Sequence, residues 1–537
     1  MSERSERLLW ALSEIDERKI DEASPEAGTR HPQWKKWGFA SVAAAVLAVA
    51  IGIGSLILPR MGGTNGTASP GSGGGAANTA EGAPGGGGAG SDGAGAFMSY
   101  AGPVFPLTLR EADGDISARR EIAFDFAPWV PGGERYSTDV LVTDAYTLTN
   151  ASEEEKTVSV LYPFSGSLYE LAELMPGLRL DGAELDAVLH AGGYSGGFRN
   201  PEGGKSEPLL NLDQLSSWEG YRALLSGGRY QLSALETYPD LSDVPVTVYA
   251  FSDYYGPEPD ADAGRPNPSI RAGFDLDYDR TTVLSYGFHG ASFDRENGKM
   301  IQEFSIPEPH YPRYGQPFYL IVIGDDIQNL TTGGYVTGGT DPDTKMLDGA
   351  GVSVERYTSD LESALRAAAE LMYAGNDRLR ESGADFEQYF GLFKEQLRSY
   401  GFLSENPMER YNTTGWLEEL NMDVCAVDRV FYLEAELTIP AGGRVELTAE
   451  LRKKSSYDFY GGSSENRGVY GFDMATKLGS NLTFTEQTAA LEDRGQIGIV
   501  RQNFGFDLEN GVGRVTLDIE QEHYYLEVRG REDRFEQ

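Results

Sequence analysis

Residues 139–164 read DVLVTDAYTLTNASEEEKTVSVLYPF. In both halves, 139–150 and 156–164, β-branched or aromatic residues alternate with polar ones, which is typical of strands that bury one face. An acidic stretch, 151–155, separates the two halves, and we expect a β-hairpin here. The same period of two recurs over most of the chain after residue 97, and it predicts a mainly β fold of antiparallel, sandwich-like units.

Several further segments fit this pattern. Asp181-Gly182 suits the positive backbone angles of a two-residue turn between strands 177–180 and 183–190. Strands are also predicted at 270–278, 281–288, 300–306, 318–323, 429–439, 444–452 and 513–520. Segment 318–323 (FYLIVI) is apolar on both faces, as expected for a central strand. Residues 440–443 are expected to close a hairpin between 429–439 and 444–452.

Two stretches show helical spacing instead. Residues 356–373 place apolar side chains on one face, with Ser359 or Thr358 as the expected N-cap and Gly375 as the stop. Residues 385–400 repeat this pattern and end at Gly401. A shorter helix is predicted within 213–226. The β units are therefore expected to carry a helical insertion.

Residues 38–58 form an uncharged, apolar run of 21 residues. At about 1.5 Å per residue such a helix spans roughly 30 Å, the thickness of a hydrocarbon core. A cleaved signal peptide is disfavoured because the preceding 37 residues carry eight acidic residues and no Ala-x-Ala site follows. We expect an uncleaved transmembrane helix that contacts the lipid bilayer.

The flanks of this run predict its orientation. Arg30, Lys35 and Lys36 precede it closely, whereas only Arg60 follows, so the N-terminus is expected in the cytoplasm of a single-pass cell-membrane protein. Residues 59–97 are Gly-rich and too poor in apolar side chains to fold, which predicts a disordered linker. The expected order is a tail (1–37), a span (38–58), this linker, two β units (98–256 and 257–350), a helical insertion (351–422) and a C-terminal β unit (423–537).

Charge and cysteine content exclude several classes of function. The 537 residues carry 45 Lys and Arg against 83 Asp and Glu, a formal net charge of −38, which repels nucleic acids. The single cysteine excludes a disulfide framework within the chain and a cysteine-based zinc site. With five histidines the chain has few metal ligands, and we expect no cofactor.

Motifs that could carry chemistry are weak. Residues 193–197 (GYSGG) match a nucleophile elbow, but 198–204 cannot begin the helix that this motif requires. Asp275, Asp277 and Asp279 alternate as in a calcium loop, although Arg280 and Tyr286 occupy the positions of its glycine and glutamate. The exposed face of a strand gives the same alternation and is the favoured interpretation. No catalytic or metal site is therefore assigned.

Tyrosines are dense in three predicted loops, 254–256, 310–314 and 457–460. Exposed rings of this kind favour binding surfaces, including platforms on which sugars stack. The alternative is that tyrosine packs well on half-buried sheets.

The tail has a pattern of its own. Leu8, Leu9, Leu12 and Ile15 form an apolar stripe on a predicted helix of about 15 residues, too short to be stable alone. The acidic residues of the tail disfavour anionic lipid, so the stripe is expected to bind a cytoplasmic protein.

Residues 9–23 (LWALSEIDERKIDEA), followed by a basic stretch and one span, resemble bacterial single-pass proteins of the anti-sigma-factor type. The resemblance covers about 55 residues. It implies that the tail holds a sigma factor while the external part senses conditions. The His and Cys zinc pattern of many anti-sigma domains is missing here.

Three classes of function stay open. The favoured one is a non-enzymatic, membrane-anchored extracytoplasmic sensor or binding protein, with an anti-sigma-like tail and an envelope glycan or protein as its external partner. An alternative is a surface-anchored enzyme that hydrolyses envelope polysaccharide or peptide. The third is a structural or adhesive envelope protein.

Overall fold

The computed structural model describes residues 102–126, 139–194, 197–198, 210–211, 222, 234–257, 268–307, 314–336, 346–411, 413–458, 468–493 and 495–531. The predicted tail, span and linker lie outside these residues, as does nearly all of the helix expected within 213–226. No helix of the described part is long and apolar enough to cross a membrane. The described residues belong to one unit, Asp92–Gln537, whose secondary structure is mainly β.

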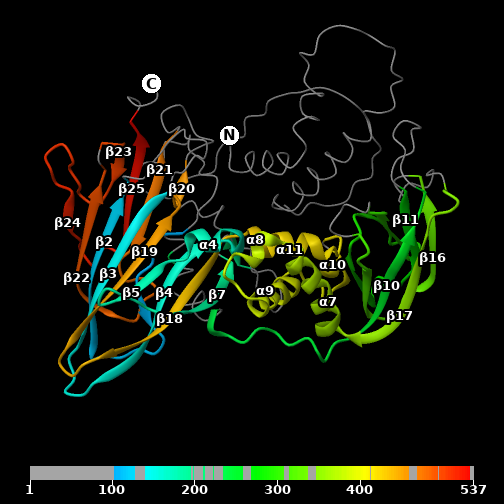
Figure 1. The fold of residues 1–537 in the computed structure, drawn as a ribbon, viewed down its shortest axis with the longest axis horizontal. Helices are drawn as coiled ribbons and strands as arrows, with labels where there is room; N and C mark the ends of the chain where they lie inside the picture. The colour runs from blue at the N-terminus through cyan, green and yellow to red at the C-terminus, as the bar shows by residue number, and fades with distance from the viewer. Residues whose placement is uncertain are drawn as a thin grey trace, which may run out of the picture. The chain divides into compact units, whose positions relative to one another are not determined.

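The largest sheet has the order β24-β22-β2-β3-β19-β5-β6 and combines strands from both ends of this unit (Figure 1). Its strands are β24 Arg514–Thr516, β22 Thr483–Glu492, β2 Ile116–Asp125, β3 Val140–Asn150, β19 Arg444–Lys453, β5 Gly177–Leu180 and β6 Ala183–Glu184. Neighbours pair antiparallel except β2 and β22, which pair parallel. The sheets are thus largely, but not wholly, antiparallel.

Two smaller sheets pack on the same core. One has the order β1-β4-β18-β7, with β1 Thr108–Leu109, β4 Lys156–Gly166, β18 Arg429–Ile439 and β7 Val188–Tyr194. The other has the order β20-β21-β25-β23, with β20 Tyr457–Asp458, β21 Tyr470–Ala475, β25 His523–Gly530 and β23 Ile497–Gln502. Strands β8 Gly197–Phe198 and β9 Leu210–Asn211 pair separately. Residues of the seven-stranded sheet and of these two four-stranded sheets share one hydrophobic cluster, which is consistent with a β-sandwich.

The segments predicted as hairpins are strands, but they do not pair with each other. β3 pairs with β19, whereas β4 pairs with β18, so residues 151–155 and 440–443 each cross from one sheet to the other. The buried Asn150 joins the two crossings, because its amide Nδ2 donates to the carbonyls of Glu154, Ile439 and Pro440 at 2.8, 3.2 and 3.2 Å. Both hairpin predictions were therefore wrong in partner, although the strands themselves are present.

The turn at Asp181-Gly182 is confirmed. Both residues have positive φ, 49° and 84°, and the turn joins β5 to β6. The predicted strand 183–190 is divided, however: β6 ends at Glu184, and β7 joins the sheet that contains β18. The alternating pattern continues through 183–190, but backbone pairing with β18 places residues from Val188 onward in the other sheet.

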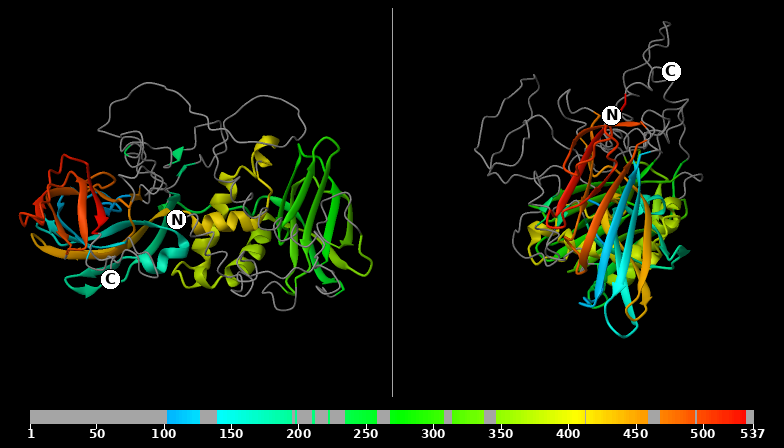
Figure 2. Two further views of the ribbon diagram at one scale, coloured as in Figure 1. Left: turned by 90° about the horizontal axis from the view of Figure 1, so that it is seen from above. Right: turned by 90° about the vertical axis from the view of Figure 1, so that its left-hand side faces the viewer.

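A second sandwich lies within residues 245–360. One sheet has the order β12-β15-β10-β17, with β12 Thr281–Tyr286, β15 Phe318–Gly324, β10 Pro245–Tyr255 and β17 Gly351–Asp360. The other has the order β13-β14-β11-β16, with β13 Gly290–Asp294, β14 Lys299–Ser305, β11 Ser269–Asp275 and β16 Gln328–Tyr335. They enclose a separate aromatic-rich core and appear as the green strands of Figure 2. β15 is central, as its apolar sequence predicted.

Helices follow the second sandwich along the chain: α7 Leu361–Ala374, α8 Asp377–Arg380, α9 Phe386–Ser399, α10 Pro407–Arg410 and α11 Leu417–Ala426. A 3₁₀ turn, η1 Leu168–Glu170, and α4 Leu171–Leu174 precede β5. Gln388 of α9 donates to the Leu189 carbonyl of β7 at 2.6 Å, and Glu418 of α11 accepts from the Gly287 amide at 2.6 Å. The helices thus contact both sandwiches.

The second predicted helix is confirmed, with Asp385 as N-cap in a full capping box. The first begins later than predicted. Its N-cap is Asp360, whose carboxylate accepts from the Ser363 amide at 2.8 Å, while Thr358 and Ser359 belong to β17. Pairing with β10 keeps these two residues extended. Gly375 is the C-cap, as predicted.

Candidate functional site

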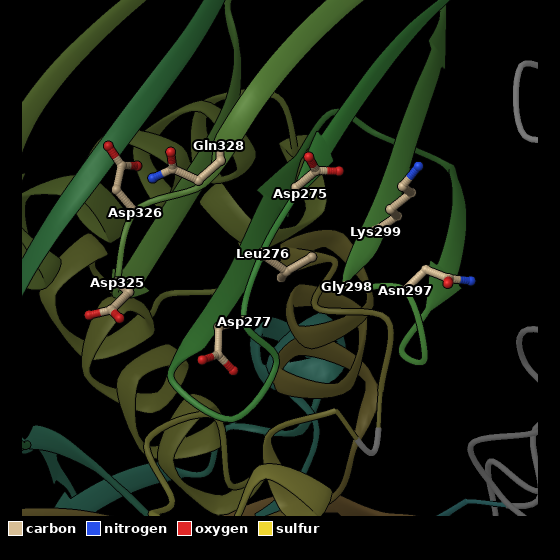
Figure 3. A pocket seen from close by; sticks show the side chains of 9 residues that line it. All are labelled: Asp275, Leu276, Asp277, Asn297, Gly298, Lys299, Asp325, Asp326 and Gln328. Carbon is tan, nitrogen blue, oxygen red and sulfur yellow. The ribbon is translucent and has the colours of Figure 1, made fainter.

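A polar hollow of about 560 Å³ opens at one end of the second sandwich. Its lining comes from the ends of four strands and the turns between them: Asp275, Leu276, Asp277, Asn297, Gly298, Lys299, Asp325, Asp326 and Gln328. Figure 3 shows Asp325 and Asp326 on one side and Asn297 and Lys299 on the other, with Asp275 and Asp277 between them. The hollow thus gathers four carboxylates and one ammonium group.

Sheet register explains why these residues meet. Asp275 ends β11 and lies opposite Lys299, the first residue of β14. Asp325 and Asp326 follow β15, which ends beside the turn that joins β11 to β12. That turn is closed by the Asp277 side chain, which accepts from the Asp279 amide at 2.9 Å. Adjacent turns of the two facing sheets therefore build the site.

The carboxylates of the hollow are bonded within the protein. Asp275 Oδ2 accepts from Asn329 Nδ2 at 2.7 Å, and Asp325 Oδ2 pairs with Arg280 at 2.9 Å. Asp326 Oδ1 accepts from the hydroxyl of Tyr249 at 3.0 Å. These bonds fix the positions of the acids and offset part of their negative charge.

Asp326 has a structural role as well. Its Oδ2 atom pairs with Arg356 at 2.5 Å, so it joins the loop after β15 to the edge strand β17. The hydrogen bond to Asp326 raises the pKa of Arg356, and burial raises the pKa of Tyr249. Through these bonds Asp326 ties β10 and β17 to this loop.

The three aspartates of the predicted calcium pattern have different positions. Asp275 and Asp277 line the hollow, whereas Asp279 does not. Within the described residues, His, Cys, Asp and Glu side chains do not gather in groups of three or more that could hold a metal ion. Calcium binding at these residues, the less favoured interpretation of their spacing, stays untested.

A second polar cluster lies on the sheet that contains β18. Glu434 receives hydrogen bonds from His190 at 2.7 Å, Ser159 at 2.6 Å and Arg110 at 2.6 and 2.7 Å. Burial opposes ionisation of Glu434, but the bonds from Ser159, Arg110 and His190 outweigh it and lower its pKa. A carboxylate with this many donors is a poor proton acceptor, so the cluster favours a structural role.

The single cysteine is inert in this fold. Cys425 lies in α11 and its side chain is buried. Burial raises the pKa of its thiol to about 12, and the thiol form predominates near neutral pH. The structure therefore does not favour Cys425 as a nucleophile.

Of the tyrosine-rich loops, the structure brings two together. The Tyr254 hydroxyl accepts from the Gly315 amide at 2.6 Å, which places 254–256 beside 314–315. Tyr255 and Tyr314 are 61% and 53% exposed. Tyr457 lies elsewhere, on β20, and donates to Glu527 at 3.2 Å. Residues 310–313 and 459–460 are outside the described part.

The remaining candidates cannot be placed. Leu8, Leu9, Leu12 and Ile15 of the tail stripe, and Ser195 of the elbow motif, lie outside the described residues. Local spacing identified Asp275 and Asp277 but not Lys299, Asp325, Asp326 or Gln328. These four come from other strand ends, and no signal in the sequence links them to the first pair.

Comparison of the chain with protein-family models, with curated proteins and with solved structures finds no match. The candidate functions therefore rest on the residues alone. In chemical terms, the hollow offers hydrogen-bond acceptors and one cation, a set suited to binding polar groups.

Proposed function

We propose that this chain is a membrane-anchored extracytoplasmic sensor or binding protein whose N-terminal tail contacts a cytoplasmic protein. The observation that carries the proposal is the order of segments in the sequence. A basic-flanked, uncharged run at 38–58 precedes a Gly-rich stretch, and a folded, acidic, mainly β part follows. Such an order suits a domain that is tethered outside the membrane.

The polar groups of the described part are compatible with binding. The acids of the hollow are held by donors of the protein, which favours fixed recognition groups over groups that exchange protons during catalysis. The proposed tail partner is a sigma factor, on the resemblance of residues 9–23 to anti-sigma-type proteins. In this proposal the external part senses a ligand and the tail releases or retains the factor.

The proposal is tested by purifying the full chain from cross-linked bacterial cells through a C-terminal affinity tag. Recovered cytoplasmic proteins are identified by mass spectrometry. A double variant of the stripe, Leu9→Asp with Leu12→Asp, is compared with Ser2→Asp and Ser5→Asp, which add the same charge outside the stripe. We expect a sigma-type transcription factor with the wild type and the control, and a loss of at least tenfold with the stripe variant.

Two results would contradict the tail assignment. One is that no cytoplasmic protein depends on the stripe. The other is that the stripe and control variants lose the partner equally, since that would indicate a general effect of charge.

A further inference from the structure

The sheet β12-β15-β10-β17 has two different faces. One packs on the facing sheet of its sandwich, through residues such as Phe251 and Leu320. On the other face, residues directly opposite one another form rows across the strands. The rows, from β12 to β17, are Leu284, Ile321, Val248 and Tyr357, then Tyr286, Tyr319, Ala250 and Glu355, then Ser252 with Ser353 and Tyr255 with Gly351.

The helices cover only part of this second face. Leu284, Ile321 and Val248 of the first row are buried in the core shared with α7 and α11. The cover ends within the rows: Tyr286 of the second row is still buried, whereas Tyr319, Ala250 and Ser252 are partly exposed. On β17, Tyr357, Glu355 and Ser353 are exposed. We call the uncovered part, Tyr255, Tyr319, Tyr357, Ala250, Ser252, Gly351, Ser353 and Glu355, the tyrosine face.

A β-bulge places Tyr255 on this face. Ser252 is opposite Ser353, but the next pair is Tyr255 with Gly351, so β10 contains one residue more than β17. Asp253 in the bulge has φ of 47°, a left-handed angle that is uncommon outside glycine. The extra residue turns Tyr254 inward, where its ring stacks on Phe318 at 5.5 Å, and turns Tyr255 outward.

Gly351 gives the Tyr255 ring its position. A Cβ atom at residue 351 would lie 2.6 Å from the Tyr255 hydroxyl oxygen and 2.8 Å from Cζ, so the ring lies close against this backbone. Its 61% exposure indicates that much of the ring remains accessible to solvent. Tyr255 is thus held at a fixed place with an open surface.

Tyr357 and Tyr319 supply the other rings. Tyr357 is 38% exposed, and Tyr319 stacks on Tyr286 with ring centroids 6.1 Å apart. Burial raises the pKa of both phenols, with Tyr357 adding to the effect at Tyr319 and Glu355 to that at Tyr357, so the phenols and this carboxylate lie near one another. Residues 351 and 357 are six apart on one strand, which at about 3.3 Å per residue separates the ends of the face by roughly 20 Å.

We propose that the tyrosine face binds a polysaccharide chain that lacks acidic groups. Sugar rings present C–H surfaces that pack on aromatic rings and hydroxyl groups that bond to polar side chains at the edge. The small floor residues Ala250, Ser252 and Ser353 leave room for such a chain between the tyrosines. The inference deepens the proposed function, on which it rests for the presence of envelope glycans.

The charge and the side chains of the tyrosine face favour an uncharged polysaccharide over an anionic polymer or a protein. Glu355 belongs to the face and Asp253 lies in the bulge beside it, and the whole chain has a net charge of −38, so an anionic polymer is repelled. A protein interface normally has a tightly packed apolar centre. The floor here is small and polar instead. Among the described residues β17 is an edge strand, and this edge is unsuited to adding a partner strand because Glu355 and Arg356 place charges at its middle.

The test is affinity electrophoresis of the full chain in detergent, in gels that contain a soluble uncharged β-glucan, a soluble uncharged galactomannan or polygalacturonate. We expect the glucan or the galactomannan to retard the protein and polygalacturonate to have no effect. Tyr255→Ala and Tyr357→Ala should each weaken retardation about tenfold, as expected for one aromatic contact. Tyr255→Phe should retain most of it.

Tyr314→Ala is the matched control, because this tyrosine is 53% exposed but lies outside the face. Thermal unfolding of each variant verifies that it is folded. Retardation by polygalacturonate alone, by none of the three polymers, or with equal loss in Tyr314→Ala would overturn the inference. Because binding by the purified chain requires neither the span nor the tail partner, such a failure is distinguishable from failure of the proposed function.

Discussion

Arg120 and Asp144 form a wholly buried ion pair, with Arg120 Nε 2.8 Å from Asp144 Oδ1 and Arg120 Nη2 2.9 Å from Asp144 Oδ2. Arg120 also donates to the carbonyls of Ala475 at 2.7 Å and Phe105 at 3.2 Å. The pair therefore joins β2 and β3 to segments from both ends of the folded unit. It is a central contact of the first sandwich.

Asp144→Ala should destabilise the folded unit by about 3–5 kcal/mol, because it leaves the guanidinium buried without its counter-charge. Urea unfolding of the full chain, followed by tryptophan fluorescence, measures the effect. Glu450→Ala is the control, since its pair with Arg179 is 44–47% exposed and should contribute less than about 1 kcal/mol. Equal effects of the two substitutions would show that the buried pair has no special role.

Gly182→Ala should cost about 1 kcal/mol, because Gly182 has φ of 84° while no heavy atom lies within 4 Å of the added Cβ. The cost would therefore arise from the backbone angle and not from a clash. Gly177→Ala, which is equally uncrowded but has no positive φ, should be nearly neutral. Thermal unfolding compares them, and a neutral Gly182→Ala would contradict the turn geometry.

Lys453 predicts a pH dependence of stability. Its side chain points into the first sandwich, and its Nζ donates to the Lys454 carbonyl at 3.0 Å. Burial lowers its pKa to about 8, against smaller opposing effects of Asp473, Asp428 and Asp139. Because the unfolded chain binds this proton more tightly, the free energy of unfolding should rise between pH 8 and about 10.5.

Lys453→Met should stabilise the protein at pH 7 and reduce this rise, since an apolar side chain avoids burying the charge. Chemical unfolding at pH 7, 8, 9 and 10 gives both quantities. Lys477→Met, at a residue whose side chain is 36% exposed, is the control and should leave the slope unchanged. A wild-type stability that falls steadily over this range, with no difference in Lys453→Met, would contradict the burial of this ammonium group.

Local pattern located many of the strands and the two long helices, α7 and α9, but not the pairing of the strands; β2, β10, β17 and α11 were not predicted. The alternation at 139–150 and 444–452 predicted two strands, and only the fold shows that Val142 lies opposite Leu451. The alternation of apolar and polar residues does not identify the partner of a strand. An acidic five-residue stretch suits a crossing between sheets as well as a hairpin. The helix start differed for a related reason, since Ser359 is held extended by Val246 of β10.

In the candidate sites, too, a local motif identifies some residues and strand pairing brings in the others. Asp275 and Asp277 come from one local motif, but the register of β11 with β14 brings Lys299 to them. The tyrosine face depends even more on pairing, because Tyr319 and Tyr357 do not belong to any tyrosine-rich loop. The bulge at Asp253, which decides the direction of Tyr255, leaves no clear mark in the sequence.

We propose that residues 38–58 anchor the chain with the β-rich part outside the cell membrane. Cysteine labelling of intact cells tests it most directly, because the native Cys425 is buried and gives little background. A membrane-impermeant maleimide is applied to Glu509→Cys, at an exposed position, and to Ser5→Cys in the tail. We expect Glu509→Cys to be labelled in intact cells and Ser5→Cys only after permeabilisation, with both variants in the membrane fraction. Labelling of Glu509→Cys only after lysis, or its recovery in the soluble fraction, would rule out an external β-rich part held by this anchor.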